Sequence, residues 1–524
     1  VFLAGLVLLR QALHGGSTAG APGQVEAAAG SSGPVGERPA PPPAPPIPEA
    51  EREQRTRRVD AIVARWVAEA ERRSKGKVNA GNVSVAVHAV EVGGARRGEL
   101  VARLSDRALR PASNMKLVTT AVALTLLGPD WHFETRLDSA APIEGGVLRG
   151  DAVVRAGGDP LTDDDGTGVV EARLDALVDG LRARGVTRIE GAVLLDEGSF
   201  ARPAPPPGWP DSSQHWTDYC ALSGGFTVNG GVLRATLARG SGSALDVRVH
   251  PAPYGLRSNY GVRVGSKNDV RVGATVSACT VKGELPSAAV DGWQASFSHP
   301  DPVDLFESVL RDRFARAGIE VAGGFARRRG PPPESSAVLA TMRSPLADVL
   351  VPINTHSVNG VADQVFLATG AAVVGDGSRQ GGMAATARAL ERLGVPAGGL
   401  EQVDGSGLSR DNRASARQIV ALMEAVHGMQ PAVREAFFRS LPVAGETGTL
   451  SKRMRGSPAQ GRVFAKTGWI SGASALSGLE RTPSGRQVLF SILVEYPRHV
   501  SGMNTHAFKP MQDELVLALF EEAP

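Results

Sequence analysis

A serine and a lysine, Ser113 and Lys116, stand at the start of the apolar run "PASNMKLVTTAVALTLL". On a helix this spacing puts both side chains on one face, with Cβ atoms about 5–6 Å apart. A serine hydroxyl is a weak nucleophile until a base takes its proton, and a neutral lysine can be that base. The chain has only eight lysines among its 57 basic residues, so one at this spacing is informative. Ser113 and Lys116 are therefore a candidate nucleophile and general base.

The surroundings distinguish this pair from a second pair with the same spacing, Ser74 and Lys77. Ser74 ends a charged helical segment, which predicts an exposed helix end. Residues 117–127 are apolar nearly all round, which predicts a buried helix. Burial lowers the pKa of a lysine from its usual ~10.4 and so favours the neutral form that a base needs. A helix N-terminus at Ser113 would also aim backbone N–H groups at a developing oxyanion.

Two further short motifs carry polar groups that suit acyl transfer. "HSVNG" contains Ser357 and Asn359, whose hydroxyl and amide can face one cleft. "AKTGW" places Lys466, Thr467 and Gly468 on a predicted strand, where glycine permits the close approach of a substrate backbone. Taken singly, these motifs also fit an ordinary turn and an ordinary strand end.

The order and the gaps of the three motifs are more specific than any one of them. The gaps are 244 residues from Ser113 to Ser357 and 109 residues from Ser357 to Lys466. This constellation resembles the penicillin-binding proteins and serine β-lactamases. The long first gap is similar to that of one branch, the class C low-molecular-mass penicillin-binding proteins (D-alanyl-D-alanine carboxypeptidase/endopeptidase family). Four other stretches, within a resemblance that covers about residues 78–520, are similar to this branch: "GGDPLT", "VDGSGLSRDN", "SLPVAGETGTLSKRM" and "ASALSGL".

The resemblance implies a role for each polar residue of the motifs. Ser113 would be the acylating nucleophile and Lys116 its general base. Ser357 and Asn359 would relay protons and hold the substrate amide, and Lys466 would polarise the Ser357 side.

On the substrate side, the resemblance implies that Thr467 helps to bind the terminal carboxylate beside Gly468. The backbone N–H groups of Ser113 and Trp469 would form the oxyanion hole, where one donor is typically worth about 10²–10³ in rate.

Three positions depart from the family pattern. Val358 stands where the family usually has Asp or Asn. The side chain at this position is expected to point away from the cleft. Asp363 stands where the family usually has Glu. Trp469 stands where the family usually has Thr or Ser, whose hydroxyl helps to hold the substrate carboxylate, so specificity or turnover is expected to differ.

The implied activity is serine-type cleavage of the terminal D-Ala-D-Ala bond, or of a D-centred cross-link, in peptidoglycan peptides. The implied partners are peptidoglycan stem peptides and, as covalent inhibitors, β-lactam antibiotics; no metal or organic cofactor is implied. A β-lactamase or esterase on the same fold is an alternative, because the sequence does not reveal a deacylating base. A weakened peptidoglycan-binding protein is another, for which Trp469 is the best support.

Hydrophobic periodicity predicts the elements that position these residues. Residues 59–67 have the spacing of an amphipathic helix, and "VSVAVHAVEVGG" alternates like a strand, with "ELVARLSDRALR" as its hairpin partner. Strand-like segments dominate from about 140 to 340, and helical patterns return afterwards. The predicted fold is α/β (α+β), a serine β-lactamase/transpeptidase-like domain split by a β-rich insertion of one or two nested domains.

The predicted boundaries divide the chain into an apolar segment, a Pro/Gly/Ala linker, the first part of the transpeptidase-like domain, the insertion and the second part of that domain. They are 1–14, 15–50, 51–140, 141–340 (with possible nesting around 230–285) and 341–524. The opening "VFLAGLVLLR" is too short to span a bilayer but fits a signal peptide, which predicts export to the periplasm or cell envelope. Any membrane association is expected through this end alone.

Composition excludes several other kinds of protein. The net charge is only +3 and the sequence has no long basic cluster, so it does not predict a nucleic-acid-binding surface. The ten histidines show no HExxH spacing, "DDD" at 163–165 fits a solvated loop, and "GSGSALD" lacks the lysine of a phosphate loop. Cys220 and Cys279 exclude a disulfide scaffold but leave either one disulfide or two buried thiols. The oligomeric state is left open.

Overall fold

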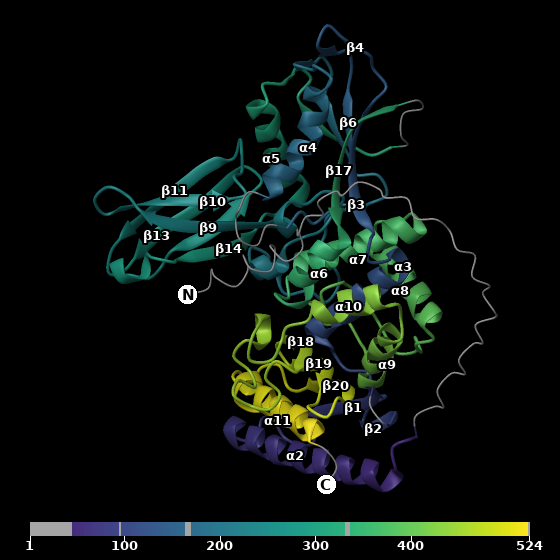
Figure 1. Ribbon diagram of the computed structural model, residues 1–524. Coiled ribbons are helices and arrows are strands. Elements are labelled where there is room, and N and C mark those ends of the chain that lie inside the picture. The colour runs from purple at the N-terminus through teal and green to yellow at the C-terminus, as the bar shows by residue number, and fades with distance from the viewer. Residues whose placement is uncertain (1–44, 94–95, 163–168, 331–335, 522–524) are drawn as a thin grey trace, which may run out of the picture. The chain divides into compact units, whose positions relative to one another are not determined.

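The structure is a computed structural model that describes residues 45–93, 96–162, 169–330 and 336–521. Its site-bearing sheet is antiparallel, with the strand order β18-β19-β20-β1-β2. The strands come from both ends of the described chain (Figure 1) and are β1 (Ser84–Gly93), β2 (Gly98–Arg103), β18 (Val463–Ile470), β19 (Ala473–Arg481) and β20 (Gln487–Glu495). Residues 98–103 pair with β1 as the hairpin pattern predicts.

Both faces of this sheet are covered by helices. Val85, Val87 and Ala89 of β1 pack in one apolar cluster with α2 (Glu49–Ser74) and α11 (Lys509–Phe520), while Val90 and Val92 pack in another with α9 (Ala416–His427). Residues of alternate parity therefore enter opposite cores. The period-two pattern is that of a strand buried on both sides.

The second core is made largely by helices that follow the β-rich region and by α3. They are α3 (Met115–Leu127), α6 (Leu346–Asn354), α7 (Asn359–Val374), α8 (Arg379–Leu393), α9 (Ala416–His427) and α10 (Pro431–Arg439). Local sequence explains the start of α9, where Ser415 and Gln418 exchange hydrogen bonds in a capping box. The predicted buried helix over 117–127 is α3, which is apolar on nearly all sides.

Between the two parts lies a region with three further sheets. One has the order β16-β8-β6-β3-β17 and another the order β15-β7-β5-β4. Their strands are β3 (His132–Ser139), β4 (Ile143–Glu144), β5 (Val147–Leu148), β6 (Ala152–Arg155), β7 (Arg188–Ile189), β8 (Val193–Asp196), β15 (Glu320–Val321), β16 (Phe325–Arg328) and β17 (Ala337–Pro345). Because β3 pairs with β17 along its length, the region closes on itself at both chain connections.

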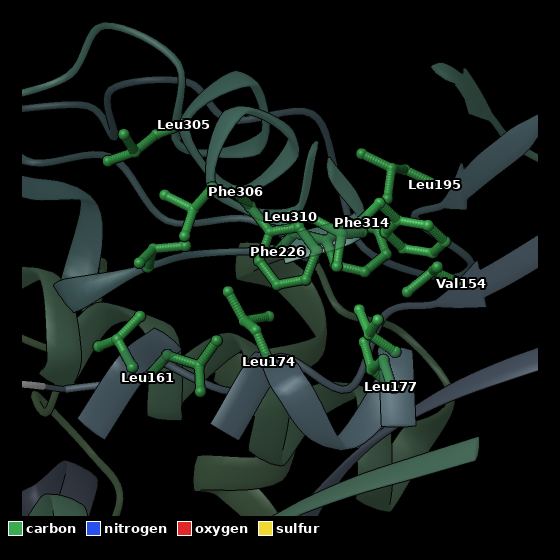
Figure 2. Close-up of a cluster of buried hydrophobic side chains, with 14 of the residues drawn as sticks. Val154, Leu161, Leu174, Leu177, Leu195, Phe226, Leu305, Phe306, Leu310 and Phe314 are labelled. Carbon is green, nitrogen blue, oxygen red and sulfur yellow. The ribbon is translucent and has the colours of Figure 1, made fainter. Parts of the chain in front are cut away.

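The β-rich region has its own apolar core. Figure 2 shows side chains of α4 (Val169–Arg182) and α5 (Pro302–Arg316) meeting there, among them Leu174 and Phe306. The rings of Phe226 and Phe306 lie 4.8 Å apart between centroids. This core is separate from the two that flank the site-bearing sheet.

The third sheet contains most of the segment around 230–285 for which nesting was predicted. Its order is β12-β13-β11-β10-β9-β14. The strands are β9 (Val232–Arg239), β10 (Ala244–His250), β11 (Arg257–Val264), β12 (Arg271–Thr275), β13 (Ala278–Leu285) and β14 (Gln294–Ser298).

Three predicted boundaries differ from the observed elements. The nested sheet runs beyond 285, because β14 pairs with β9. The boundary at 340/341 falls inside β17, whose partner β3 begins at His132, before the predicted start of the insertion. Ordered structure begins before residue 51: Ile47 is buried and α2 starts at Glu49. The predicted segment 1–14 and residues 15–44 lie outside the described part.

Cys220 and Cys279 are both buried free thiols, so the disulfide alternative is wrong. Among the helices that the structure describes, none has the length and apolar character needed to cross a membrane.

Candidate active site

Ser113 lies where α3 meets the edge strand β18. A short 3-10 turn, Ala112–Asn114, carries it and continues directly into α3. Asn114 fastens this turn to the sheet, since its side-chain amide donates to the carbonyl of Lys466 at 2.8 Å and its oxygen accepts from Ser477. Ala112 has a φ of 47°, a left-handed conformation that non-glycine residues adopt mostly where the surroundings enforce it.

Lys116 is completely buried beneath Ser113. Its Nζ is 3.3 Å from Ser113 Oγ, 2.6 Å from Asn359 Oδ1 and 2.8 Å from the carbonyl oxygen of Ser406. Desolvation lowers the pKa of Lys116 to about 8, while Asp363 and Asp404 partly oppose this shift. Near neutral pH a fraction of Lys116 is therefore a free base within reach of the serine hydroxyl.

The second predicted motif lies on the other side of this lysine. Asn359 is the first residue of α7, and Ser357, two residues earlier, has a left-handed φ of 62°. Lys466 Nζ donates to Ser357 Oγ at 2.8 Å and is itself completely buried. Burial and the neighbouring Lys116 hold the pKa of Lys466 well below its usual value. The five residues predicted to be catalytic thus form two neighbouring hydrogen-bonded groups, one of Ser113, Lys116 and Asn359 and the other of Ser357 and Lys466.

Gly468 has a different neighbour from the one predicted. A Cβ at this position would lie 2.9 Å from the carbonyl oxygen of Pro111 and 3.1 Å from the backbone nitrogen of Ser113. The absence of a side chain therefore lets β18 lie close to the turn that carries Ser113. The prediction had considered only the close approach of a substrate backbone. β18 nevertheless is the first strand of its sheet, so its outer edge is unpaired along most of its length.

Thr467 and Trp469 lie at the outer side of the site. Thr467 Oγ1 donates to Thr449 Oγ1 at 2.8 Å, and Trp469 is 58% exposed. The side chain of Trp469 interacts with the hydroxyl of Tyr496, whose pKa is raised by burial. Of the other two departures, Val358 packs against the core and Asp363 is buried near Lys116.

Two polar groups of the site come from segments with no predicted catalytic role. The carbonyl of Tyr219, in the β-rich region, accepts from Asn359 Nδ2 at 2.9 Å. Thr449 belongs to "GETGTL", inside a stretch already noted for its resemblance, and that was the available signal. Nothing local in the sequence marks the Tyr219 carbonyl, because a backbone group is common to every residue.

The "VDGSGLSRDN" stretch forms the floor under Lys116. Ser406 presents its carbonyl to Lys116, and Gly407 follows with a φ of 82°. A Cβ on Gly407 would lie 1.8 Å from the carbonyl oxygen of Ala112. Only glycine fits between this floor and the turn that carries the nucleophile.

The competing motifs lie elsewhere. Ser74 ends α2 as predicted, but this helix end is buried rather than exposed. The Ser74 hydroxyl accepts a hydrogen bond from the backbone N–H of Val78 at 2.9 Å. Residues 266–268, "SKN", repeat the spacing of Ser357 and Asn359 and lie in the connection between β11 and β12. In the described part of the chain, no group of three or more His, Cys, Asp or Glu residues is placed to hold a metal ion. Residues 163–165 lie outside that part.

Comparison with known proteins agrees with the motifs. The D-Ala-D-Ala carboxypeptidase 3 (S13) family matches residues 74–516. A D-alanyl-D-alanine carboxypeptidase of Actinomadura sp. (strain R39) is 32% identical over 446 residues, which are 81% of this chain and 79% of that protein. A D-alanyl-D-alanine carboxypeptidase DacB of Haemophilus influenzae is 25% identical over 394 residues, 72% of this chain and 79% of the relative.

A solved structure supports the fold. The crystal structure of penicillin binding protein 4 (dacB) from Haemophilus influenzae superposes with a TM-score of 0.70 at 22% identity, over 87% of this chain and 99% of that one. The predicted fold class and family are confirmed. The chain belongs to the D-Ala-D-Ala carboxypeptidase 3 (S13) family and is a serine-type D-Ala-D-Ala carboxypeptidase.

Proposed function

We propose that Ser113 is the nucleophile with which this enzyme cuts the terminal D-Ala-D-Ala bond of peptidoglycan stem peptides, and D-centred cross-links between them. The observation that supports this most is the 3.3 Å contact between Ser113 Oγ and the Nζ of a completely buried lysine, Lys116. A desolvated lysine can be neutral near working pH and accept the hydroxyl proton.

The reaction follows from these groups in two steps. Lys116 takes the proton from Ser113 Oγ, which attacks the peptide carbonyl and forms an acyl-enzyme. The proton passes to the leaving amine, and the terminal D-alanine departs. Water then attacks the ester, its proton returns through Lys116, and Ser113 is regenerated with release of the shortened peptide.

The remaining residues have supporting roles in this proposal. Asn359 holds the substrate amide and the Lys116 amine, with which its oxygen is in contact at 2.6 Å. Ser357 and Lys466 pass the proton towards the leaving group along their 2.8 Å hydrogen bond. Thr467 binds the terminal carboxylate.

The backbone N–H groups of Ser113 and Trp469 complete the site as the oxyanion hole. They stabilise the charge that develops on the carbonyl oxygen, a contribution that needs no side chain at position 469.

We further infer that β-lactams acylate Ser113 and that the enzyme works outside the cytoplasm, in the periplasm or cell envelope. Penicillin binding protein 4 of Haemophilus influenzae has been crystallised with a β-lactam, which supports the first point by fold likeness. The stem peptides of the cell wall lie outside the cytoplasmic membrane, and the S13 family to which the chain belongs acts on them.

Mass spectrometry after incubation with a labelled penicillin tests the nucleophile. The expected result is one adduct, on the peptide that contains Ser113, and none in Ser113→Ala. Ser74→Ala is the matched control because Ser74 has the same spacing to a lysine, and it should label fully. Full labelling of Ser113→Ala would overturn the assignment.

A further inference from the structure

Two buried lysines give the site an unusual charge problem. Lys116 and Lys466 have no exposed surface, and the charge of Lys116 lowers the pKa of Lys466. A buried cation is strongly unfavourable unless an opposite charge or several acceptors face it. The protonated form of Lys116 has three oxygen acceptors within hydrogen-bond distance, and a carboxylate nearby stabilises its charge further.

Two carboxylates act on Lys116, those of Asp363 and Asp404. Asp404 is already saturated, since both of its oxygens accept two hydrogen bonds each. The four donors are Trp209 Nε1, the backbone nitrogens of Gly407 and Ser409, and Asn412 Nδ2. Its charge is therefore largely spread over local donors.

Asp363 is different. It is 6% exposed, one oxygen accepts only from the backbone nitrogen of Ser406 at 2.7 Å, and the other has no partner among the described residues. The same Ser406 turns its carbonyl to Lys116 at 2.8 Å, so a single residue links the carboxylate to the lysine. Asp363 also follows Asn359 by one turn of α7, which puts both on the helix face directed at Lys116.

We propose that Asp363 is a positioning residue that balances the charge of protonated Lys116 and thereby sets the pH at which Lys116 becomes a base. It touches neither the substrate nor the reacting atoms. This inference rests on the proposed roles of Ser113 and Lys116.

Other ionisable groups near this pair do not supply the same balance. Lys466 is a second cation, and Cys220 is a buried thiol whose pKa is raised by burial and by nearby carboxylates including Asp363. A cavity of about 220 Å³ borders Asp363 and Asp404, and Arg202 and Arg379 contribute to its lining. These arginines are cations as well, so Asp363 remains the carboxylate with a free oxygen.

The direction of the pH effect follows from electrostatics. Burial and Asp404 together raise the pKa of Asp363 well above its usual value, and Lys116 partly opposes this rise, so the two groups titrate as a linked pair. An ionised Asp363 favours protonated Lys116 and holds its pKa up, against desolvation, at about 8. Removing the carboxylate should let the pKa of Lys116 fall further, by about one unit or more. Acylation should then persist at lower pH.

The test is the second-order rate constant for acylation of the full chain by penicillin, measured from pH 5 to 10. The wild-type rate constant should rise with pH, and the midpoint of this rise should lie at about pH 8. In Asp363→Asn the midpoint should lie about one unit or more lower. An unmoved midpoint would overturn the proposal, since a purely structural role would alter the rate but not its pH dependence.

Two variants keep the test interpretable. Asp363→Glu retains the carboxylate, the adjoining cavity leaves room for its extra methylene, and its midpoint should stay near the wild-type value. Asp159→Asn removes another buried carboxylate with an unpartnered oxygen, one that does not act on Lys116, and should leave the midpoint unchanged. If the asparagine variant does not fold, Asp363→Ser removes the charge without adding an amide that needs partners.

The outcomes separate the two proposals. If the proposed function fails, wild-type Ser113 is not acylated at any pH. If only the present inference fails, the wild type is acylated, and the neutral variants keep its pH midpoint.

Discussion

Lys466 Nζ donates a hydrogen bond to Ser357 Oγ at 2.8 Å, across a gap of 109 residues in the sequence. The lysine comes from the edge strand β18 and the serine from the turn before α7. Since Ser357 holds a left-handed backbone and Lys466 is completely buried, the contact joins two constrained positions.

Because of this contact, Ser357 and Lys466 should act as one unit. Ser357→Ala and Lys466→Gln are each expected to slow penicillin acylation by about 10²-fold or more, in the range typical of proton transfer. The double variant should be little slower than either single one, because each substitution already breaks the shared path. Stopped-flow acylation rates for the three variants check this.

Lys452→Gln is the control for a lysine substitution on the exposed surface, and it should acylate at the wild-type rate. Fully multiplicative losses in the double variant would contradict a shared role for Ser357 and Lys466.

A methyl group on Gly407 should displace the nucleophile turn. Gly407→Ala places a Cβ 1.8 Å from the carbonyl oxygen of Ala112, so one of the two backbones must move. Loss of most acylation is expected, together with a fall in melting temperature, both measurable on the purified chain.

The matched control is Gly394→Ala at the end of α8. Its φ of 66° is also left-handed, but a Cβ there meets nothing within 4 Å. It should lower stability by about 1 kcal/mol through backbone conformation alone and leave acylation intact. Equal effects of the two substitutions would show that the contact with Ala112 is unimportant.

Trp469 should weaken recognition of a free terminal carboxylate. Its indole supplies no hydroxyl beside Thr467, and a lost hydrogen bond to a charged group is worth roughly 1.5–3 kcal/mol. Trp469→Thr is therefore expected to raise kcat/KM at least about tenfold on a pentapeptide ending in D-Ala-D-Ala, with a smaller gain on a cross-linked dimer.

The neighbouring Thr449 offers a test of the same carboxylate site. Its hydroxyl lies 2.8 Å from that of Thr467, so Thr449→Val should lower kcat/KM on the pentapeptide more in the wild type than in Trp469→Thr. An equal loss on both substrates after Trp469→Thr would mean that the tryptophan only packs.

Truncation tests how much the residues before α2 contribute to stability. Deleting residues 1–43 should leave the melting temperature unchanged, because most of them, residues 15–43, are rich in Pro, Gly and Ala and offer little apolar surface. Deleting 1–50 should lower it, since Ile47 packs in the cluster of α2 and the sheet. Ile47→Ala in the full chain, expected to cost about 2–4 kcal/mol, isolates that contribution. A similar fall for both deletions would show instead that residues 1–43 contribute to stability.

Much of the architecture followed from local patterns. The apolar run after Lys116 predicted a buried helix, and α3 is one; the alternation around 84–93 predicted β1 and its hairpin partner. Strand-like segments were predicted from about 140 to 340, and the strands β4 to β16 lie there. The ends were less accurate, because β14 and the full length of β17 are defined by partners distant in sequence, β9 and β3.

The sequence by itself determined the identity and order of the reactive groups: a serine and a lysine one helical turn apart, then the pairs around Ser357 and Lys466. Helix geometry fixes the first spacing wherever the helix lies, so it is visible without a fold. The tertiary structure decided what surrounds them. The Tyr219 carbonyl contacts Asn359, the Thr449 hydroxyl contacts Thr467, and two glycines, Gly407 and Gly468, let their backbones lie close to the turn that carries Ser113.

It also decided that Lys116 faces Asp363 through Ser406. These contacts depend on backbone positions that the packing of two cores sets to within a fraction of an ångström, and no local propensity encodes them. The same burial, which removes water from Lys116 and Lys466, turns two ordinary side chains into groups with lowered pKa values. Desolvation is a property of the whole fold, whereas the spacing of residues is a property of the chain.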